Sequence, residues 1–322
     1  ALQASAVLLV LAVAMRLALL PVHGWLIQVM EAPTPVSALL HAGVVNLGGF
    51  VLIRFAPLLE QAPLARTLLV ALGLGTAVLA GLVMLTRISI KVRLAWSTVA
   101  QMGFLALECG LGLYTLAALH LIGHSLYKAH AFLAASSAVR YTRLQALQDP
   151  RKPLATSLWL APLASVGVVL GLQMAISPGA WPLWWGLVLG LAWAPLLWLP
   201  TPSGPDGGHL RRLALSGLVI VTGLTGITLL AHTLPLNLQD APHHALGAVA
   251  LAGMAALYLF LVLLHTRPNA LEAWRRRSYA GFYLDEHYTR LTLRLWPTRW
   301  TSDQPPSHVA PSPHPTPTQL SD

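Results

Sequence analysis

Nine runs of about 20 mostly apolar residues follow one another along the first 265 residues of this chain. A run of this length can cross the hydrocarbon layer of a bilayer as one α-helix, because a helix satisfies its own backbone hydrogen bonds. Only 10% of the 322 residues are charged, whereas a soluble domain is about one quarter charged. We therefore predict an all-α polytopic membrane protein whose spans cover approximately residues 4–22, 36–56, 64–86, 94–112, 115–138, 154–176, 181–199, 213–233 and 244–265.

Basic residues between the apolar runs predict the orientation of the chain. Lys and Arg gather in four segments that a nine-span chain places on one side of the membrane, namely 87–93, 140–152, 211–212 and 267–277. Neither residue type occurs in the opposite loops, near 113, 177–180 and 234–243. Because basic loops stay in the cytoplasm, we expect a cytoplasmic C-terminus, with Arg54 and Arg66 as exceptions on the other side. The same placement accounts for the net charge of +9, so we expect no nucleic-acid partner.

The composition divides the chain into three parts. Residues 1–265 form the transmembrane domain; its first run lacks a basic n-region, so we expect no signal peptide, and further helices are expected upstream of Ala1. Residues 266–300 are rich in Arg and aromatic side chains, which predicts a basic amphipathic segment on the cytoplasmic face. Residues 301–322 are rich in Pro and Ser, which predicts disorder.

Three titratable residues recur at intervals of four in the run 115–138. His120, His124 and Lys128, called the His-Lys row below, would share one face of a helix, each step rising about 6 Å. Ionisable groups at membrane depth are costly and usually mark an ion or proton path. Histidine exchanges protons near neutral pH, and a lysine removed from water can do so as well. We therefore interpret the row as part of a proton path.

A metal site is the competing interpretation of the row, since His at positions i and i+4 can bind zinc. No third ligand of suitable type lies near them in the sequence, and a single cysteine, Cys109, cannot provide a cysteine-based zinc or iron–sulfur site. We predict no metal and no cofactor.

Two carboxylates fall in or beside the apolar runs. Glu31 precedes Pro33 and Pro35, which interrupt a helix and free backbone carbonyls, so the region 31–37 is expected to be a broken helix with an acid beside it. Alternatively, Glu31 caps a helix that begins near Ser37. Glu108 lies late in its run, where it either reaches the membrane interface or partners the histidines.

Two further polar residues lie within apolar runs. Arg16 stands near the end of the first run and either reaches the interface or pairs with an acid on another helix. His41 lies among small and apolar residues, where it is either a relay in the path or a histidine held by hydrogen bonds.

Several stretches resemble a known family. The segments that carry the resemblance are WLIQVMEAPTPVSALLHAG, IKVRLAWSTVAQMGF and HLIGHSLYKAHAFLAASSAV. In this order they are similar to the antiporter-like proton-conducting subunits of respiratory NADH:quinone oxidoreductase (subunit L type) and of Mrp antiporters. Most similar within that superfamily is the DabB-type membrane subunit of inorganic carbon transporters, on the segments HAGVVNLGGFVLIRFAPL, SLYKAH and GFYLDEHYTRLTLRLWP.

The resemblance implies an antiporter-like helix bundle in a bacterial inner membrane that conducts H⁺ or Na⁺ along a central hydrophilic axis. By position, Lys128 matches the central lysine, His120 and His124 the histidines before it, and His41 the histidine after the Pro-Thr-Pro-Val-Ser motif. Arg16 stands where respiratory relatives have an intramembrane lysine, whose glutamate partner would lie upstream of Ala1.

Two features depart from the respiratory pattern. Arg16 is a poor proton carrier because arginine does not readily give up its proton. The four runs between 154 and 265 contain no Lys, Asp or Glu, although respiratory relatives have a further lysine in this region. We therefore expect an exit half of the path that is different, shorter or supplied by a partner.

A DabB-type subunit implies a large soluble zinc protein, similar to β-carbonic anhydrases, as its partner on the cytoplasmic face. Any hydration of carbon dioxide would then belong to that partner, and this chain by itself would not be an enzyme. Arg275, Arg276 and Arg277 are the expected docking residues. The alternatives are a subunit of a respiratory or Mrp-type complex, or a scaffold whose polar residues only pack helices.

Overall fold

The computed structural model describes residues 1–135, 152–202, 207–267 and 272–295. Its chain forms two compact units, Ala1–Phe282 and Tyr283–Asp322. In the second unit one helix is described, α15 (Leu284–Leu295). The predicted boundaries at 265 and 300 stay predictions, and the Pro/Ser-rich segment 301–322 lies outside the described residues.

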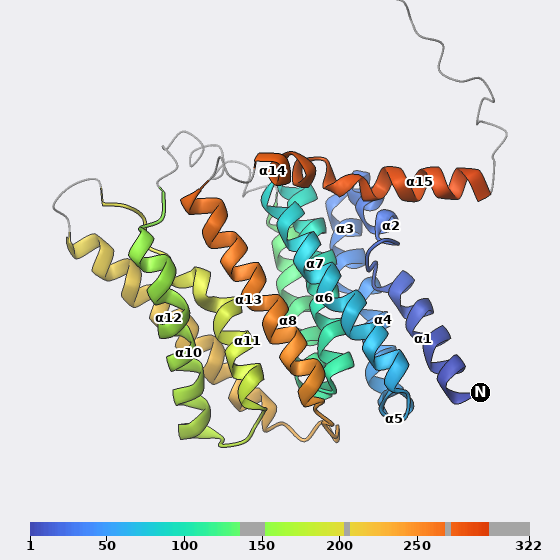
Figure 1. The fold of residues 1–322 in the computed structure, drawn as a ribbon, viewed down its shortest axis with the longest axis horizontal. Helices are drawn as coiled ribbons and strands as arrows, with labels where there is room; N and C mark the ends of the chain where they lie inside the picture. The colour runs from blue at the N-terminus through green and yellow to red at the C-terminus, as the bar shows by residue number, and fades with distance from the viewer. Residues whose placement is uncertain (136–151, 203–206, 268–271, 296–322) are drawn as a thin grey trace, which may run out of the picture. The chain divides into compact units, whose positions relative to one another are not determined.

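The first unit consists of helices and connecting turns (Figure 1). Its N-terminal half comprises α1 (Leu2–Arg16), α2 (Gly24–Gln28), η1 (Val29–Glu31), α3 (Thr34–Ala42), η2 (Val44–Asn46), α4 (Leu47–Arg54), α5 (Ala56–Glu60), α6 (Pro63–Leu85), α7 (Ile90–Leu111) and α8 (Tyr114–Leu133). Its C-terminal half comprises α10 (Ala155–Ile176), α11 (Leu183–Trp193), η3 (Ala194–Leu197), α12 (Gly207–His232), α13 (His244–Thr266) and α14 (Glu272–Tyr279). The short helix η4 (Gly281–Tyr283) includes the boundary between the two units in the chain.

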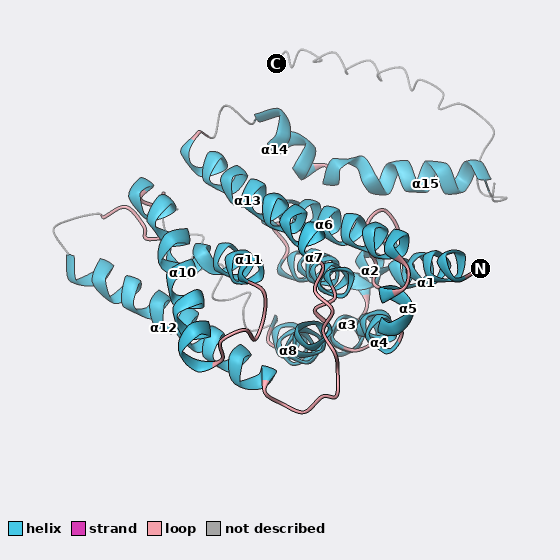
Figure 2. Ribbon diagram, turned by 60° about the horizontal axis from the view of Figure 1, so that its bottom comes forward, coloured by secondary structure: helices cyan, strands magenta, loops and turns pink. Residues whose placement is uncertain are grey.

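The predicted all-α membrane fold is confirmed. Within the described residues there is no strand, only a single bridge between Pro153 and Pro200 (Figure 2). Each of the nine predicted runs coincides with a helix or a chain of short helices. Six of these are long and apolar enough to cross a membrane: Thr34–Arg54, Pro63–Leu85, Ile90–Leu111, Ala155–Ile176, Gly208–His232 and His244–Thr266.

The other three runs differ in length or polarity. Two are shorter apolar helices, Leu2–Arg16 and Leu183–Leu197. The third, α8, has 20 residues, but its histidines and lysine make it less apolar than the six long helices. These are also the residues that give α8 its chemistry.

The first helix ends earlier than predicted. We expected a span to residue 22, but α1 ends at Arg16 and the chain turns through the buried residues Leu17 to Leu20. Pro21 explains the correction, because proline lacks an N–H and disfavours helical geometry at the residue before it. The free N–H of Leu20 instead donates to Thr76 Oγ1 on α6, at 3.1 Å.

The proline-interrupted region is present as predicted. Between Gly24 and Arg54 the chain forms five consecutive helical pieces, of which the last three together make the candidate span Thr34–Arg54. Pro33 is the residue before α3, and Pro35 lies in the first turn of α3, where the missing N–H would have no helical partner anyway. This arrangement brings the carbonyl of Ala32 out of any helix.

Close packing of α6 on α7 forms the centre of the N-terminal half. A Cβ atom at Gly73 would lie 2.8 Å from Gly103 O, and one at Gly103 would lie 2.6 Å from Ala77 N. Helix backbones therefore touch at these two glycines, as is common between membrane helices. Helix α8 packs on α7 and α3 (Figure 2). In the C-terminal half, α13 packs on α11 and also on α6 and α7, and α12 packs on α10 and also on α8.

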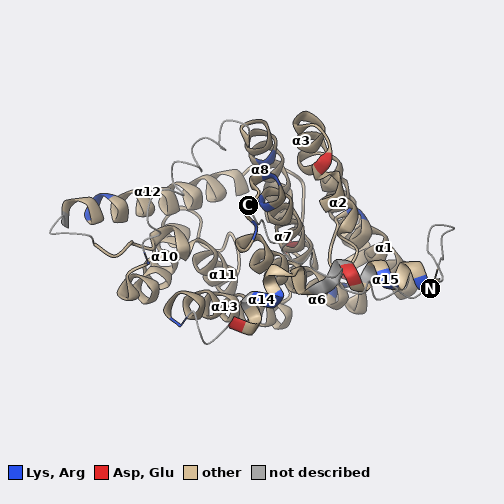
Figure 3. Ribbon diagram, turned by 90° about the horizontal axis from the view of Figure 1, so that it is seen from above, with Lys and Arg blue, Asp and Glu red and all other residues tan. Residues whose placement is uncertain are grey.

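Hydrogen bonds join loops at each of the two ends of the bundle. At one end, Thr86 Oγ1 donates to Ser278 O at 3.3 Å, so the basic turn after α6 meets the segment that follows α13 (Figure 1). At the opposite end, Ala241 N donates to Gly112 O at 2.9 Å, which joins two of the loops without Lys or Arg. Figure 3 shows that α10 and α11 carry no Lys, Arg, Asp or Glu along their length.

Arg66 has a structural role that the charge pattern did not reveal. It lies inside α6 and is buried, with Nε donating to Gly110 O at 3.1 Å and an Nη donating to Ala241 O at 2.9 Å. These bonds join α6, the end of α7 and the loop before α13. The exception to the positive-inside pattern at Arg66 is therefore a structural arginine at the opposite end of the bundle.

Candidate functional site

Lys128 lies at the centre of the candidate site. Its side chain is fully buried on α8, and its ammonium donates to the carbonyl of Leu94 at 3.0 Å and to the hydroxyl of Ser97. Both acceptors belong to α7. An ammonium has three donors and a buried charge requires hydrogen-bond partners, so the α7 oxygens are what allow a lysine to stand inside this helix bundle.

His124 lies one turn before Lys128 and is also buried. Neither of its ring nitrogens has a hydrogen-bond partner among the described residues. His41, on α3, is fully buried with the same property, and its ring stacks on Phe132 with centroids 4.6 Å apart. Buried polar groups are nearly always paired, so unpaired imidazoles point to bound water or to a functional role.

Glu108 pairs with the first histidine of the row. Its Oε2 accepts a hydrogen bond from Nδ1 of His120 across 2.8 Å, and the carboxylate is only 5% exposed. Pairing with the histidines was one of the two expectations for this side chain. The ring of His120 lies 6.2 Å from that of His124, so the acid on α7 extends the His-Lys row by one group.

Lys91 is a residue of this region that the sequence did not single out. Its Nζ donates to the carbonyl of Ala32 at 2.9 Å, and Ser37 Oγ donates to the same oxygen at 3.3 Å. That carbonyl is one of those freed by the proline-interrupted segment. The two prolines predicted a free acceptor, and a search for its donor among the nearby lysines could have found Lys91.

Glu31 and Arg16 lie apart from the row. Both are exposed, and neither forms an ion pair within the described part of the chain. The expectation that Glu31 caps a helix beginning near Ser37 is wrong, because α3 begins at Thr34, follows Pro33 and has no side-chain cap. Arg16 is the last residue of α1. Their part in an ion path stays a prediction.

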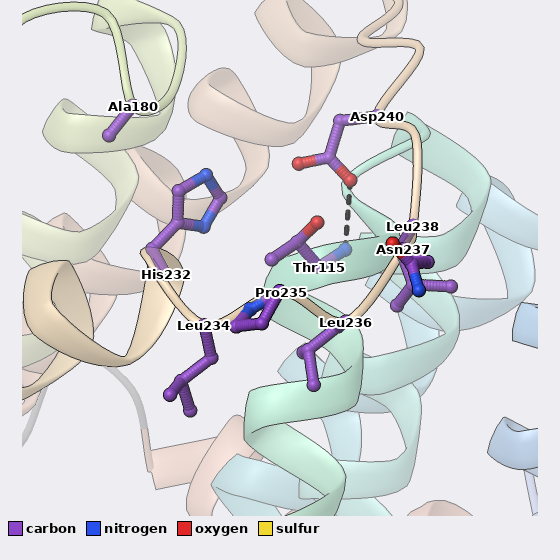
Figure 4. Close-up of a pocket in the computed structure, with 9 residues that line it drawn as sticks. All are labelled: Thr115, Ala180, His232, Leu234, Pro235, Leu236, Asn237, Leu238 and Asp240. Atoms are coloured by element: carbon purple, nitrogen blue, oxygen red, sulfur yellow. Dashed lines mark hydrogen bonds between the residues drawn. The ribbon is translucent and has the colours of Figure 1, made fainter.

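A second polar site lies at the end of the bundle without basic loops (Figure 4). Asp240 Oδ1 accepts a hydrogen bond from the backbone N–H of Thr115 at 2.8 Å, satisfying one of the free N–H groups at the start of α8. Around it is a pocket of about 380 Å³ whose wall includes His232 and Asn237. The sequence did not predict a role for Asp240, because no pattern in its loop indicates contact with α8.

The predicted docking arginines lie on α14. Arg276 and Arg277 are exposed, and Arg276 pairs with Glu272 at 2.5 Å, one turn away; the side chain of Arg275 is outside the described residues. Ser278 Oγ donates to Leu82 O at 3.2 Å and an Arg87 Nη donates to Tyr279 O at 3.0 Å. These bonds hold α14 at the end of the bundle that carries the basic loops.

Comparison with known proteins agrees with the membrane fold. Residues 1–179 match the family described as NADH:quinone oxidoreductase/Mrp antiporter, TM. The match covers more than half of the chain, so this protein belongs to that family and is an integral membrane protein.

Two of the named relatives are probable inorganic carbon transporter subunits. The chain is 42% identical over 308 residues to the probable inorganic carbon transporter subunit DabB of Hydrogenovibrio crunogenus, covering 92% of this chain and 57% of the relative. It is 39% identical over 314 residues to DabB2 of Halothiobacillus neapolitanus, covering 93% of this chain and 56% of the relative. The chain therefore spans about half the length of these relatives.

More distant similarities lie in the respiratory and Mrp branches. NADH-quinone oxidoreductase subunit L of Rhodobacter capsulatus is 42% identical over 135 residues, which are 42% of this chain and 19% of that protein. A chain in the structure of the Mrp complex from Dietzia sp. is 25% identical with a TM-score of 0.42, covering 87% of this chain and 30% of that chain.

Proposed function

We propose that this chain is the ion-conducting part of a membrane subunit that moves H⁺ or Na⁺ and thereby drives the accumulation of inorganic carbon. The names of the two DabB relatives support the substrate, and their similarity extends over nearly the whole chain. Membership of an antiporter family supports ion movement as the source of energy.

The observation that carries the proposal is the buried ammonium of Lys128 at one end of a line of titratable groups. Glu108 and His120 form a hydrogen-bonded pair at the other end of this line, and His124 lies between them and Lys128. Helix α8 runs from the end with Asp240 to the end with the basic loops, so a proton passed along the line moves in the direction of the membrane normal. His and Lys side chains can exchange protons, but they are poor ligands for Na⁺. We therefore favour H⁺ as the conducted ion.

The proposal includes a soluble zinc protein, similar to β-carbonic anhydrases, that docks on the cytoplasmic face. Hydration of carbon dioxide takes place in that partner, and ion flow through this chain makes the overall process one-way. The exposed arginines Arg276 and Arg277 support docking at α14, because they lie at the end of the bundle with the basic loops. By the positive-inside rule this end faces the cytoplasm.

A respiratory or Mrp-type subunit is the second candidate. The 42% identity to subunit L over 135 residues favours it for the N-terminal part of the chain. Purification of the full-length protein from its native membrane separates the two candidates. The first expects a zinc protein to co-purify, and the second expects redox or antiporter subunits.

The test of the proposed function replaces Lys128 with alanine in the full-length protein. In a strain that needs carbon accumulation to grow in air, Lys128→Ala should abolish growth, because the central proton-exchanging group is lost. The matched control is Lys152→Ala, since Lys152 is exposed in a loop and should be dispensable. Membrane insertion and partner binding are measured in both variants.

Normal growth of the Lys128→Ala strain, with the variant inserted and its partner bound, would reject the proposal. A scaffold role makes a different prediction. It expects growth and ion flux to survive simultaneous replacement of His120, His124 and Lys128 by residues of similar size.

A further inference from the structure

Helix α15 carries an apolar stripe along one face. Leu284, Tyr288, Leu291 and Leu295 stand at positions i, i+4, i+7 and i+11, so they lie within about 60° of one another around the helix. We call these four residues the α15 stripe. Leu291 and Leu295 are 56% and 61% exposed. An amphipathic helix normally buries such a face, so the stripe is an interaction surface whose occupant has to be identified.

Basic side chains border the stripe on one side. His287, Arg290 and Arg294 follow one another at intervals of three and four residues, and all three are exposed. The acids Asp285 and Glu286 both fall in the first turn, where carboxylates favour the N-terminal end of a helix. From residue 288 to the end of the helix, the charged residues are arginines. The occupant of the stripe therefore meets positive charge at its edge.

The chain enters α15 from the end of the bundle that carries the basic loops. Gly281 lies close to this end, because a Cβ atom at this residue would stand 3.0 Å from an Nη of Arg87. Its φ of 63° is one that glycine adopts readily, and α15 begins three residues later, at Leu284. The end of a membrane-spanning bundle borders the lipid headgroups. The first residues of α15 are therefore tethered beside a bilayer surface.

The composition of α15 fits a helix that lies on a membrane and does not cross it. Seven of its twelve residues are polar, so the helix is both too short and too polar to span the hydrocarbon layer. Helices that lie in the interface combine low overall hydrophobicity with a leucine-rich or aromatic face and arginines or lysines beside it. The stripe and its two arginines have this pattern.

We propose that α15 lies in the plane of the bilayer surface and binds anionic phospholipids. The α15 stripe enters the outer part of the acyl chains, and Arg290 and Arg294 bind lipid phosphates, whose geometry suits the guanidinium fork. In the orientation proposed above, this surface is the cytoplasmic leaflet, which is rich in anionic lipids. The inference requires a membrane-spanning bundle and not ion conduction, so it would stand even if Lys128→Ala retained full activity.

Spin labels test the position of the stripe. The full-length protein, with Cys109 and any other cysteine replaced, is placed without partners in nanodiscs of phosphatidylcholine and phosphatidylglycerol. Leu291→Cys and Leu295→Cys carry the label on the stripe, and Leu293→Cys carries it on the opposite face as the matched control. Labels on the stripe should be reached by oxygen and shielded from a soluble nickel chelate. The label at Leu293→Cys should show the reverse.

Two results of the labelling would overturn the proposal. One is equal access of the nickel chelate to all three labels, because the stripe would then face water. The other is shielding that develops only when a soluble protein that co-purifies with the chain is added back. The stripe would then be a protein interface and not a lipid-binding face.

Neutralising the two arginines tests the anionic lipid. With the label at Leu291→Cys, Arg290→Gln together with Arg294→Gln should raise access of the nickel chelate about fivefold or more, since each basic residue at an anionic surface favours binding by a factor of about five. Wild-type α15 in nanodiscs of phosphatidylcholine alone should show a similar rise. The matched control is Arg276→Gln together with Arg277→Gln, which removes two exposed arginines of α14 and should leave access unchanged.

Unchanged access in the Arg290→Gln, Arg294→Gln variant would contradict binding of anionic lipid by these arginines. Equal access in wild-type nanodiscs with and without phosphatidylglycerol would contradict it as well. An equal rise in the α14 control would assign the effect to net charge and reject a lipid site on α15.

Discussion

At the scale of single residues, the site depends on which of its buried polar side chains have hydrogen-bond partners. Lys128 is buried with two oxygens of α7 on its ammonium, and Glu108 is buried against His120. His124 and His41 have no such partner among the described residues. The line from Glu108 to Lys128 has hydrogen-bond partners at both ends and, in the described part of the chain, none at His124 between them. This suits proton transfer, because the imidazole of His124 remains free to accept and donate a proton.

The pair of Glu108 and His120 gives a prediction at this scale. Glu108→Gln keeps a hydrogen-bonding side chain of the same size but removes the charge that attracts a proton to His120, so proton flux should fall about tenfold or more while the protein still inserts. The double variant with His120→Gln should be no slower than Glu108→Gln alone, because the two groups act as one unit. Flux in vesicles measures both.

The control for this pair is Glu60→Gln, because Glu60 is exposed at the end of α5. Equal flux in Glu60→Gln and Glu108→Gln would show that the carboxylate at Glu108 takes no part in the path. If the fold-loss of proton flux in the double variant equals the product of the losses in the two single variants, the two groups act independently.

The spacing of the His-Lys row could be predicted from the sequence because it depends only on helix periodicity. The hydrogen-bond partners of the row could not be predicted in this way. Ser97 and Leu94 reach Lys128, and Glu108 reaches His120, through the packing of α7 on α8, which local pattern does not determine. The bond from Lys91 to Ala32 likewise depends on where the proline-interrupted segment lies against α7.

At the scale of elements, α6 and α7 form the rigid pair that positions the acceptors of Lys128. Their backbones touch at Gly73 and Gly103, where any side chain would collide with backbone atoms. The apolar runs predicted both helices, since a span needs length and hydrophobicity. The early end of α1 was missed because apolar residues continue past Arg16 to Pro21, and only the proline marks the turn.

A glycine substitution tests this helix contact. Gly103→Ala puts a Cβ 2.6 Å from Ala77 N, and backbone cannot move aside as a side chain can, so stability should fall by about 1–3 kcal/mol. Gly75→Ala on α6 has open space and should be neutral or slightly stabilising. Thermal unfolding of the purified protein in detergent measures the difference, and an unchanged midpoint for Gly103→Ala would contradict the close contact.

At the scale of the whole molecule, the described polar groups follow one another across the first unit. The pocket at Asp240 lies at one end, and the line from Glu108 to Lys128 continues from there towards the end with the basic loops. The spans of the C-terminal half contribute no Lys, Asp or Glu to this series.

The central claim is that ions cross the membrane by way of Lys128. The most direct measurement is proton flux in sealed vesicles that contain the full-length protein with its partner, followed with a pH-sensitive dye under an imposed potential. We predict flux in the wild type and in Lys152→Ala, and no flux above that of protein-free vesicles in Lys128→Ala. Flux in Lys128→Ala equal to the wild type would contradict the account.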